Sequence, residues 1–145
     1  NPPDVRCCNA IAGRGWDDNP HFFFIENLEA VRAIMEQNDH ANQRVWVTEF
    51  GWATWEGLPS APPEEWITYN DASDQLNYTI RAFEISQQLP YVDMMILWNL
   101  NFANTFTVQN SQEVAGYSII NPVIFPSERP LYWALAQSTG ALELE

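Results

Sequence analysis

Two short apolar segments constrain the fold more than any other feature of this sequence. The first is Val45–Phe50 (VWVTEF) and the second is Val92–Trp98 (VDMMILW). Both are rich in residues that favour strands, and each has apolar side chains at consecutive positions. Consecutive apolar positions predict strands that are buried on both faces, as in a parallel sheet that is covered by helices.

Segments typical of helices alternate with these strands. Helices are predicted over Asn27–Asn38, Asp74–Leu89 and Leu131–Ser138. Pro130 opens the last helix, and Gly140 stands where a C′ glycine ends one. The alternation predicts an α/β fold whose parallel strands are joined by right-handed crossovers. Apolar residues at helical spacing support the first two helices: Leu28, Val31, Ile34 and Met35, then Leu76, Ile80 and Phe83.

The connections differ in length at the two ends of the strands. Those that enter the strands are short, whereas Gly51–Ser73 and Asn99–Pro130 are long and aromatic, the latter with an extended piece over Gly116–Ile120. Ligands of α/β barrels and open sheets bind at the carboxyl ends of the strands. Because Glu49 and Trp98 lie at those ends, we expect both side chains to face one site.

Composition narrows the classes of partner. The chain has 145 residues, of which 46% are hydrophobic, and this suits one domain with its own core. Six basic and 19 acidic residues give a net charge of −13, which disfavours nucleic acid and anionic membrane surfaces as partners, because both bind clustered basic groups. No apolar run reaches the roughly 18–20 residues of a membrane span. Carbohydrate, which is uncharged and has apolar ring faces, suits the composition.

The two cysteines, Cys7 and Cys8, are adjacent. They are too few for a zinc site, which takes about four ligands. Two states suit them: a pair of reduced thiols, or a disulfide between neighbours whose Cα atoms are about 3.8 Å apart. The isolated His21 and His40 are more typical of solvated or capping residues than of ligands, so we expect no metal site.

The segments VWVTEFGWAT and MMILWNLNF together resemble the last two barrel strands of the large clan of retaining TIM-barrel glycoside hydrolases. In that clan a Glu at the end of strand seven is the nucleophile, and a Trp at the end of strand eight forms the floor under the sugar. The resemblance implies that Glu49 is the nucleophile and that Trp98 is the floor, with no cofactor. A Glu after a strand is otherwise commonly a surface or capping residue, and Trp98 is otherwise core.

Each of these residue types suits a defined role in a retaining mechanism. A retaining mechanism needs an ionised carboxylate beside the anomeric carbon, and a strand end holds Glu49 rigidly. Indole faces pack on the C–H surface of a sugar ring, so Trp52 and Trp55 are candidate binding residues as well, although both could equally pack within their loop. Asn101, just past Trp98, is a candidate for hydrogen bonds to sugar hydroxyls.

The resemblance covers nearly the whole chain. GRGWDDNPHFFFIENLEAVRAIM is similar to the loop and helix after strand six, and GYSIINP with RPLYWALAQ to the final loop and closing helix. It implies the C-terminal part of a (β/α)₈ barrel. Residues 1–21 would be the loop after strand six and residues 22–140 would run from helix six to helix eight. Residues 141–145 would form a tail, in which Leu-Glu is typical of a cloning remnant.

Two departures limit the activity expected of this chain. The Asn-Glu-Pro type motif that carries the clan's acid/base is absent, as is the His or Tyr at the end of strand six that orients the nucleophile. A complete barrel takes about 200–250 residues or more. We therefore expect a longer protein, compatible with secretion, that hydrolyses β-linked glycosides with retention, while this chain alone is inactive.

Two strands cannot close a barrel, so we also expect exposed edges that drive self-association. Two other functions compete with the enzyme. One is a non-catalytic sugar-binding module that uses Trp52, Trp55 and Trp98, and the other is a structural domain whose aromatic residues are core. A carboxylate between a strand and Gly-Trp favours the enzyme, because a binding module has no need of it.

Overall fold

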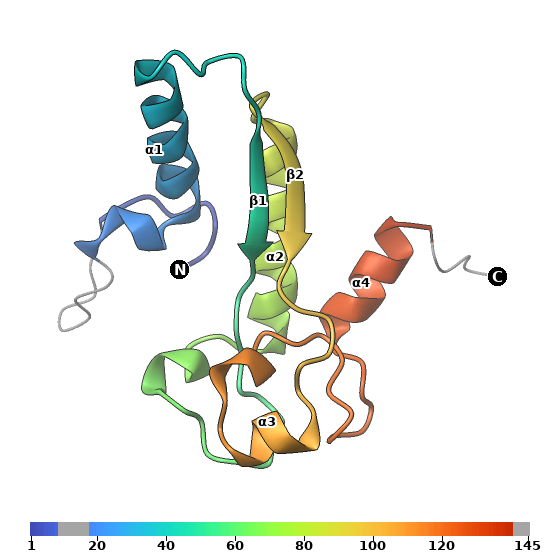
Figure 1. The fold of residues 1–145 in the computed structure, drawn as a ribbon. Helices are drawn as coiled ribbons and strands as arrows, with labels where there is room; N and C mark the ends of the chain where they lie inside the picture. Colours follow the sequence, from blue (N-terminus) through green and yellow to red (C-terminus); the bar gives the residue numbers. More distant parts are fainter. Residues whose placement is uncertain (9–17, 141–145) are drawn as a thin grey trace. The chain divides into compact units, whose positions relative to one another are not determined.

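The structure, a computed structural model, describes residues 1–8 and 18–140, which form a mixed α/β fold (Figure 1). The predicted loop over residues 1–21 is thus described in part, and the tail over 141–145 lies outside the described residues. Short 3₁₀ turns are η2 (Pro20–Phe22), η3 (Glu65–Thr68) and η4 (Glu113–Ala115). The strands and α-helices are β1 (Val45–Phe50), β2 (Val92–Leu97), α1 (Phe24–Gln37), α2 (Ala72–Gln87), α3 (Thr105–Gln109) and α4 (Pro130–Ser138).

The strands β1 and β2 pair with each other in parallel, as their arrows in Figure 1 show. The Val45 N–H donates to the Tyr91 carbonyl at 2.7 Å, and the Trp98 N–H donates to the Phe50 carbonyl at 2.8 Å. Both strands and their parallel pairing are as predicted, although β2 ends one residue earlier than expected. The mixed α/β class is therefore confirmed.

The expectation that both strands are buried on both faces is wrong for the described structure. Trp46 of β1 is 61% exposed, and Met94 and Ile96 of β2 are 40% and 47% exposed. Val45 pairs level with Val92 and side chains alternate along a strand, so Trp46 projects from the face opposite Met94 and Ile96. The described helices thus leave apolar side chains uncovered on both faces.

The exposed apolar side chains of β1 and β2 predict that the chain self-associates. Unpaired strand edges and exposed apolar side chains favour association with a second chain. We expect dimers or larger oligomers in light scattering of the purified chain at high micromolar concentration. Ile96→Lys, which places a charge on the exposed face of β2, should shift the distribution towards monomer. A wild-type chain that scatters as a monomer under these conditions would contradict the prediction.

The chain divides into two compact units, Asn1–Val47 with Arg81–Met95, and Thr48–Ile80 with Ile96–Glu145. Residues of both strands and of α2 fall in each. In the first unit, α1 buries Leu28 but exposes Val31 and Ile34, so only part of its predicted apolar face is covered. Among the described residues of this unit, the buried apolar side chains include Pro3, Phe23, Leu28, Val45, Ala82 and Ile85.

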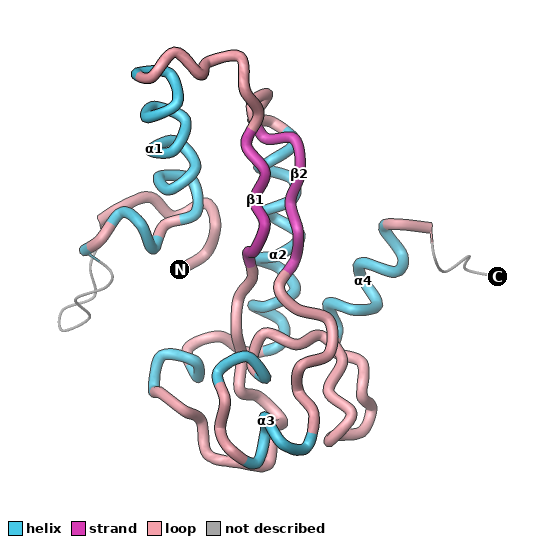
Figure 2. The backbone as a smooth tube through the Cα atoms, in the orientation of Figure 1, coloured by secondary structure: helices cyan, strands magenta, loops and turns pink. Residues whose placement is uncertain are grey.

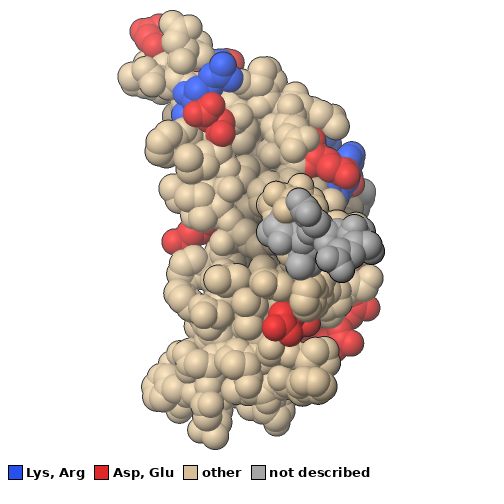
Figure 3. Space-filling model, turned by 90° about the vertical axis from the view of Figure 1, so that its right-hand side faces the viewer, with Lys and Arg blue, Asp and Glu red and all other residues tan. Residues whose placement is uncertain are grey.

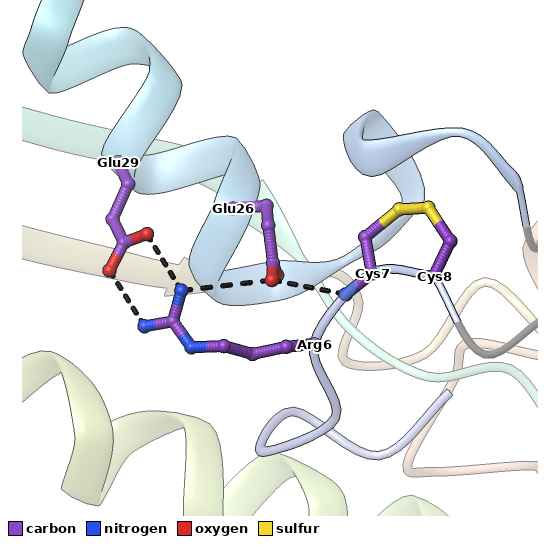
Figure 4. Close-up of polar contacts among 5 residues, drawn as sticks. All are labelled: Arg6, Cys7, Cys8, Glu26 and Glu29. Atoms are coloured by element: carbon purple, nitrogen blue, oxygen red, sulfur yellow. Dashed lines mark hydrogen bonds and ion pairs between the residues drawn. A yellow bond between two sulfur atoms is a disulfide. The ribbon is translucent and has the colours of Figure 1, made fainter.

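Ion pairs fix the N-terminal segment of the first unit to α1 (Figure 4). The Arg6 guanidinium donates to both oxygens of Glu29, at 2.8 and 2.7 Å, and this hydrogen bonding lowers the pKa of Glu29. The Cys7 N–H donates to Glu26 at 3.0 Å. Of the two states open to the cysteines, the structure has Cys7 and Cys8 joined as a disulfide.

Other arginines of the first unit are paired in the same way. Arg32 contacts Glu36 at 2.6 Å, and Arg81 contacts Asp4 at 2.9 Å. On the face shown in Figure 3, basic side chains lie beside acidic ones and further acidic groups are scattered over the surface.

Within the described residues, no helix has the length and apolarity that a membrane span needs.

Helix α2 begins earlier and buries a different stripe than predicted. The N–H of Asp74 donates to the side chain of Asp71 at 2.7 Å, and the N–H of Asp71 donates to that of Asp74 at 3.2 Å. This reciprocal cap starts the helix at Ala72. The expected Leu76, Ile80 and Phe83 are half-buried, and the buried residues of the helix are Gln75, Thr79, Ala82, Ile85 and Ser86.

Gln75 is buried because its amide satisfies backbone carbonyls. Its Nε2 donates to the carbonyl of Trp52 at 3.0 Å and to that of Gly116 at 3.3 Å. The polar Gln75 is therefore buried, whereas the apolar pattern predicted burial of its neighbour Leu76.

The second unit has a core built by the long connections that follow the strands (Figure 2). These connections contain η3, α3 and η4, which the sequence did not predict. The predicted extended piece over Gly116–Ile120 is irregular, with a turn at Gly116 and Tyr117, although Ile120 forms an antiparallel bridge with Glu128. The side chains of these connections pack together and form one hydrophobic core. The core members are Ala53, Trp55, Leu58, Ile67, Ala103, Val108 and Ala115.

A buried arginine ties this core together. The Arg129 Nη2 donates to the Glu56 carbonyl at 3.0 Å, and with the Asn121 amide turned so that its oxygen faces the guanidinium, also to Asn121 at 2.9 Å. Burial lowers the pKa of Arg129 to about 10. Arg129 therefore links the connection after β1 to the start of α4. As predicted, Pro130 is the first residue of this helix, and Gly140 (φ +70°) follows its C-terminal end.

Candidate functional site

A cavity of about 400 Å³ lies at the carboxyl ends of β1 and β2, and all of its lining belongs to the second unit. Three stretches of chain form it: the end of β1, the residue after β2, and the segment around η4. Glu49 and Trp98 both line it, so the expectation that they face one cleft is confirmed. The lining residues are Glu49, Phe50, Gly51, Trp98, Glu113, Val114 and Tyr117.

The strand register explains why Glu49 and Trp98 meet. The hydrogen bond from the Trp98 N–H to the Phe50 carbonyl sets Phe50 level with Leu97 in a parallel ladder. Glu49 is therefore level with Ile96, and Trp98 lies two residues further along β2. Because side chains alternate with a period of two, all three project from the same face.

Gly51 brings the two strand ends close together. A Cβ atom at this position would lie 2.5 Å from the carbonyl oxygen of Trp98, which is closer than real Cβ contacts allow. Only glycine therefore permits the observed approach of β1 to the backbone of Trp98.

We expect Gly51→Ala to displace the Trp98 backbone and to lower the free energy of unfolding by about 1–3 kcal/mol, the usual cost of overpacking. Urea unfolding of the variant beside the wild-type chain measures this. Thr48→Ala is the matched control, since Thr48 is an exposed residue of the same strand. Equal stability of the Gly51 variant and the wild type would refute the close approach.

Trp98 is half-buried and braced from one side. Its ring meets Phe102 edge to face, with centroids 5.0 Å apart and an interplanar angle of 88°. The peptide bond between Trp98 and Asn99 is cis. Edge-to-face packing fixes the orientation of an indole without covering both of its faces.

The buried Asn99 joins the end of β2 to the segment around η4. Its Nδ2 donates to the Val114 carbonyl at 2.9 Å, and its Oδ1 accepts from the Ser118 hydroxyl at 2.6 Å. The same oxygen accepts from the Phe102 N–H at 3.1 Å. These contacts hold Glu113 and Tyr117 at the cavity, although both are distant from Glu49 in sequence.

Glu113 and Tyr117 are site residues that the sequence analysis missed. The Tyr117 hydroxyl donates to Glu113 Oε1 at 3.4 Å. Burial, followed by the charge of Glu113, raises the pKa of Tyr117 to about 12, so the phenol keeps its proton at neutral pH. No local pattern in the connection after β2 marks these two residues, because the contacts that place them are made by Asn99.

Three residues predicted to bind substrate do not line this cavity. Trp55 is 6% exposed, belongs to the core, and donates from Nε1 to the Ser60 carbonyl at 2.7 Å. Trp52 meets Phe50 and Tyr78 edge to face, with centroids 6.4 and 6.0 Å away. Asn101 is exposed. For Trp55 this is a correction, because its indole is buried by the loop that carries it.

The cavity offers a carboxylate, a second carboxylate beside a phenol, and one indole. The described residues contain no group of three or more metal-ligating side chains. Glu49 is exposed to the solvent of the cavity and is available as a nucleophile or a hydrogen-bond acceptor. Comparison of the chain with protein families, with curated proteins and with solved structures finds no match.

Proposed function

We propose that this chain is the C-terminal part of a (β/α)₈ barrel of a retaining glycoside hydrolase. Glu49 is the nucleophile and Trp98 is the floor under the sugar at the cleaved bond. The observation that carries the proposal is that both residues line one cavity at the carboxyl ends of adjacent parallel strands, the edge at which barrel enzymes place their active sites.

The chemistry assigns Glu49 a defined step. Its carboxylate attacks the anomeric carbon as the glycosidic bond breaks, and a glycosyl ester forms on Glu49. A second carboxyl group protonates the leaving oxygen and then activates the water that releases the sugar. The barrel strands that precede this chain supply that acid, as the resemblance implies.

The cavity suits one sugar unit on an aromatic floor. Its volume lies within the range of about 300–1,000 Å³ that is usual for small-molecule sites. Trp98, braced by Phe102, offers an indole face to the C–H surface of the ring. Trp55, one of the three tryptophans on which a sugar-binding module would rest, is core, and this favours the enzyme over the module.

Covalent labelling tests the proposal. A 2-deoxy-2-fluoro β-glycoside with a good leaving group slows both steps of retention but allows the ester to accumulate. In the complete barrel, mass spectrometry of a peptic digest should find the fluorosugar on the peptide that carries Glu49. Labelling of another carboxylate, or stoichiometric binding without labelling, would refute the assignment.

A further inference from the structure

The cavity contains a second carboxylate whose role the proposed nucleophile does not explain. Glu113 lines the same cavity as Glu49 and Trp98, and it comes from η4, well beyond the strand ends. The Asn99 side chain fixes this segment through the Val114 carbonyl and the Ser118 hydroxyl. Glu113 is therefore positioned at the site by a buried anchor.

The contact with Tyr117 decides what Glu113 can do there. The Tyr117 hydroxyl donates a hydrogen bond to Oε1 of Glu113, so this oxygen already has a partner. A carboxylate oxygen accepts hydrogen bonds, and the second oxygen of Glu113 remains available to a ligand in the cavity.

Charge then limits which sugars fit. The charged side chains of the described lining are Glu49 and Glu113, and both are acidic. A sugar hydroxyl can donate to either carboxylate, whereas the carboxylate of a uronic acid would meet two like charges. Specificity of this kind comes from repulsion of the wrong ligand as much as from attraction of the right one.

We propose that Glu113, held by Tyr117, makes this cavity select uncharged sugar units over uronic acids. The inference rests on the proposed function, because it assumes that the cavity binds a sugar. Glu113 acts here as a specificity residue, through a hydrogen bond to a sugar hydroxyl and through repulsion of an anionic substituent. Tyr117 acts through Glu113 as a positioning residue.

Two probes isolate the effect. Phenyl β-D-glucopyranoside and phenyl β-D-glucuronide differ only in a hydroxymethyl group against a carboxylate. Titration of the 145-residue chain with each, followed by tryptophan fluorescence, gives two dissociation constants for every variant. We expect the wild type to prefer the glucoside, and Glu113→Gln to reduce this preference about five- to tenfold, by weakening glucoside binding and strengthening glucuronide binding.

Control variants separate charge from structure. Glu113→Asp keeps the charge and should keep the preference, and Tyr117→Phe should reduce it by less than Glu113→Gln does. Glu65→Gln is the matched control, because Glu65 opens η3 as Glu113 opens η4 and does not line the cavity. Thermal melts of each variant confirm that it is folded.

The outcomes distinguish this inference from the proposed function. Binding that Trp98→Ala abolishes, together with a preference that Glu113→Gln leaves unchanged, overturns the inference alone. An equal effect of Glu65→Gln, or equal weakening of both probes by Glu113→Gln, overturns it as well. Absence of glucoside binding to the folded wild-type chain removes both the sugar site and the inference.

Discussion

Replacing the proposed nucleophile Glu49 by alanine, in the barrel enzyme proposed above, is expected to lower turnover by on the order of 10⁵-fold, the usual cost of removing a nucleophile. Without the carboxylate no glycosyl ester forms, and the acid alone cannot complete the reaction. The loss should fall on kcat, because the proposed sugar contacts of Trp98 and Glu113 are unchanged in this variant. Steady-state hydrolysis of aryl β-glucosides measures it.

Added azide gives a second test of the Glu49→Ala variant. A small anion that enters the space left by the carboxylate can attack the anomeric carbon in its place, so added azide should restore part of the turnover and yield a glycosyl azide. Glu65→Ala is the control, because it removes an exposed carboxylate outside the cavity. If Glu49→Ala retained wild-type turnover, Glu49 would not be the nucleophile.

The strands and their paired site residues could be predicted because the determining interactions are local or periodic. Dense β-branched and aromatic residues define Val45–Phe50, and the structure has β1 over the same residues. Alternation with a period of two then brings Glu49 and Trp98 to one face once the strands lie in parallel. Loop length alone indicated the edge at which the cavity is found.

The residues that were missed depend on long-range contacts. Glu113 reaches the cavity because Asn99 binds the Val114 carbonyl, and no spacing within Asn99–Pro130 encodes that contact. Trp55 was misassigned because aromatic residues in a polar loop suggest a binding surface, whereas the loop folds on itself and buries the indole under Leu58 and Ile67. Whether such a residue is core or surface depends on which side chains pack against it, and a single sequence does not show which ones do.

Exposure of the strands has the same origin. Consecutive apolar residues in β1 and β2 indicate cover on both faces, and the described helices do not supply all of it. Apolar positions in a strand reflect the burial of that strand in the complete protein, and other parts of that protein contribute to the burial. The exposed Trp46, Met94 and Ile96 are therefore consistent with the barrel proposed above.

The 145-residue chain alone is expected to show no hydrolysis of aryl β-glycosides, although it carries the proposed nucleophile. Retention needs a proton for the leaving oxygen as Glu49 attacks, and general-acid help is typically worth about 10²–10⁴ in rate. The inference above gives Glu113 a role in specificity, and the proposed acid belongs to the preceding part of the barrel. Alignment of substrate on a complete barrel contributes several kcal/mol more.

Assay of the wild-type chain beside Glu49→Ala and Glu113→Gln decides this prediction. With no working acid, all three should release phenol from phenyl β-glucoside, whose leaving group needs a proton, at the rate of buffer alone. Hydrolysis that Glu49→Ala removes and Glu113→Gln retains would mean that an oligomer of the chain supplies another acid. Hydrolysis that both variants remove would identify Glu113 as the proton donor, because neither the nucleophile nor the acid alone sustains retention.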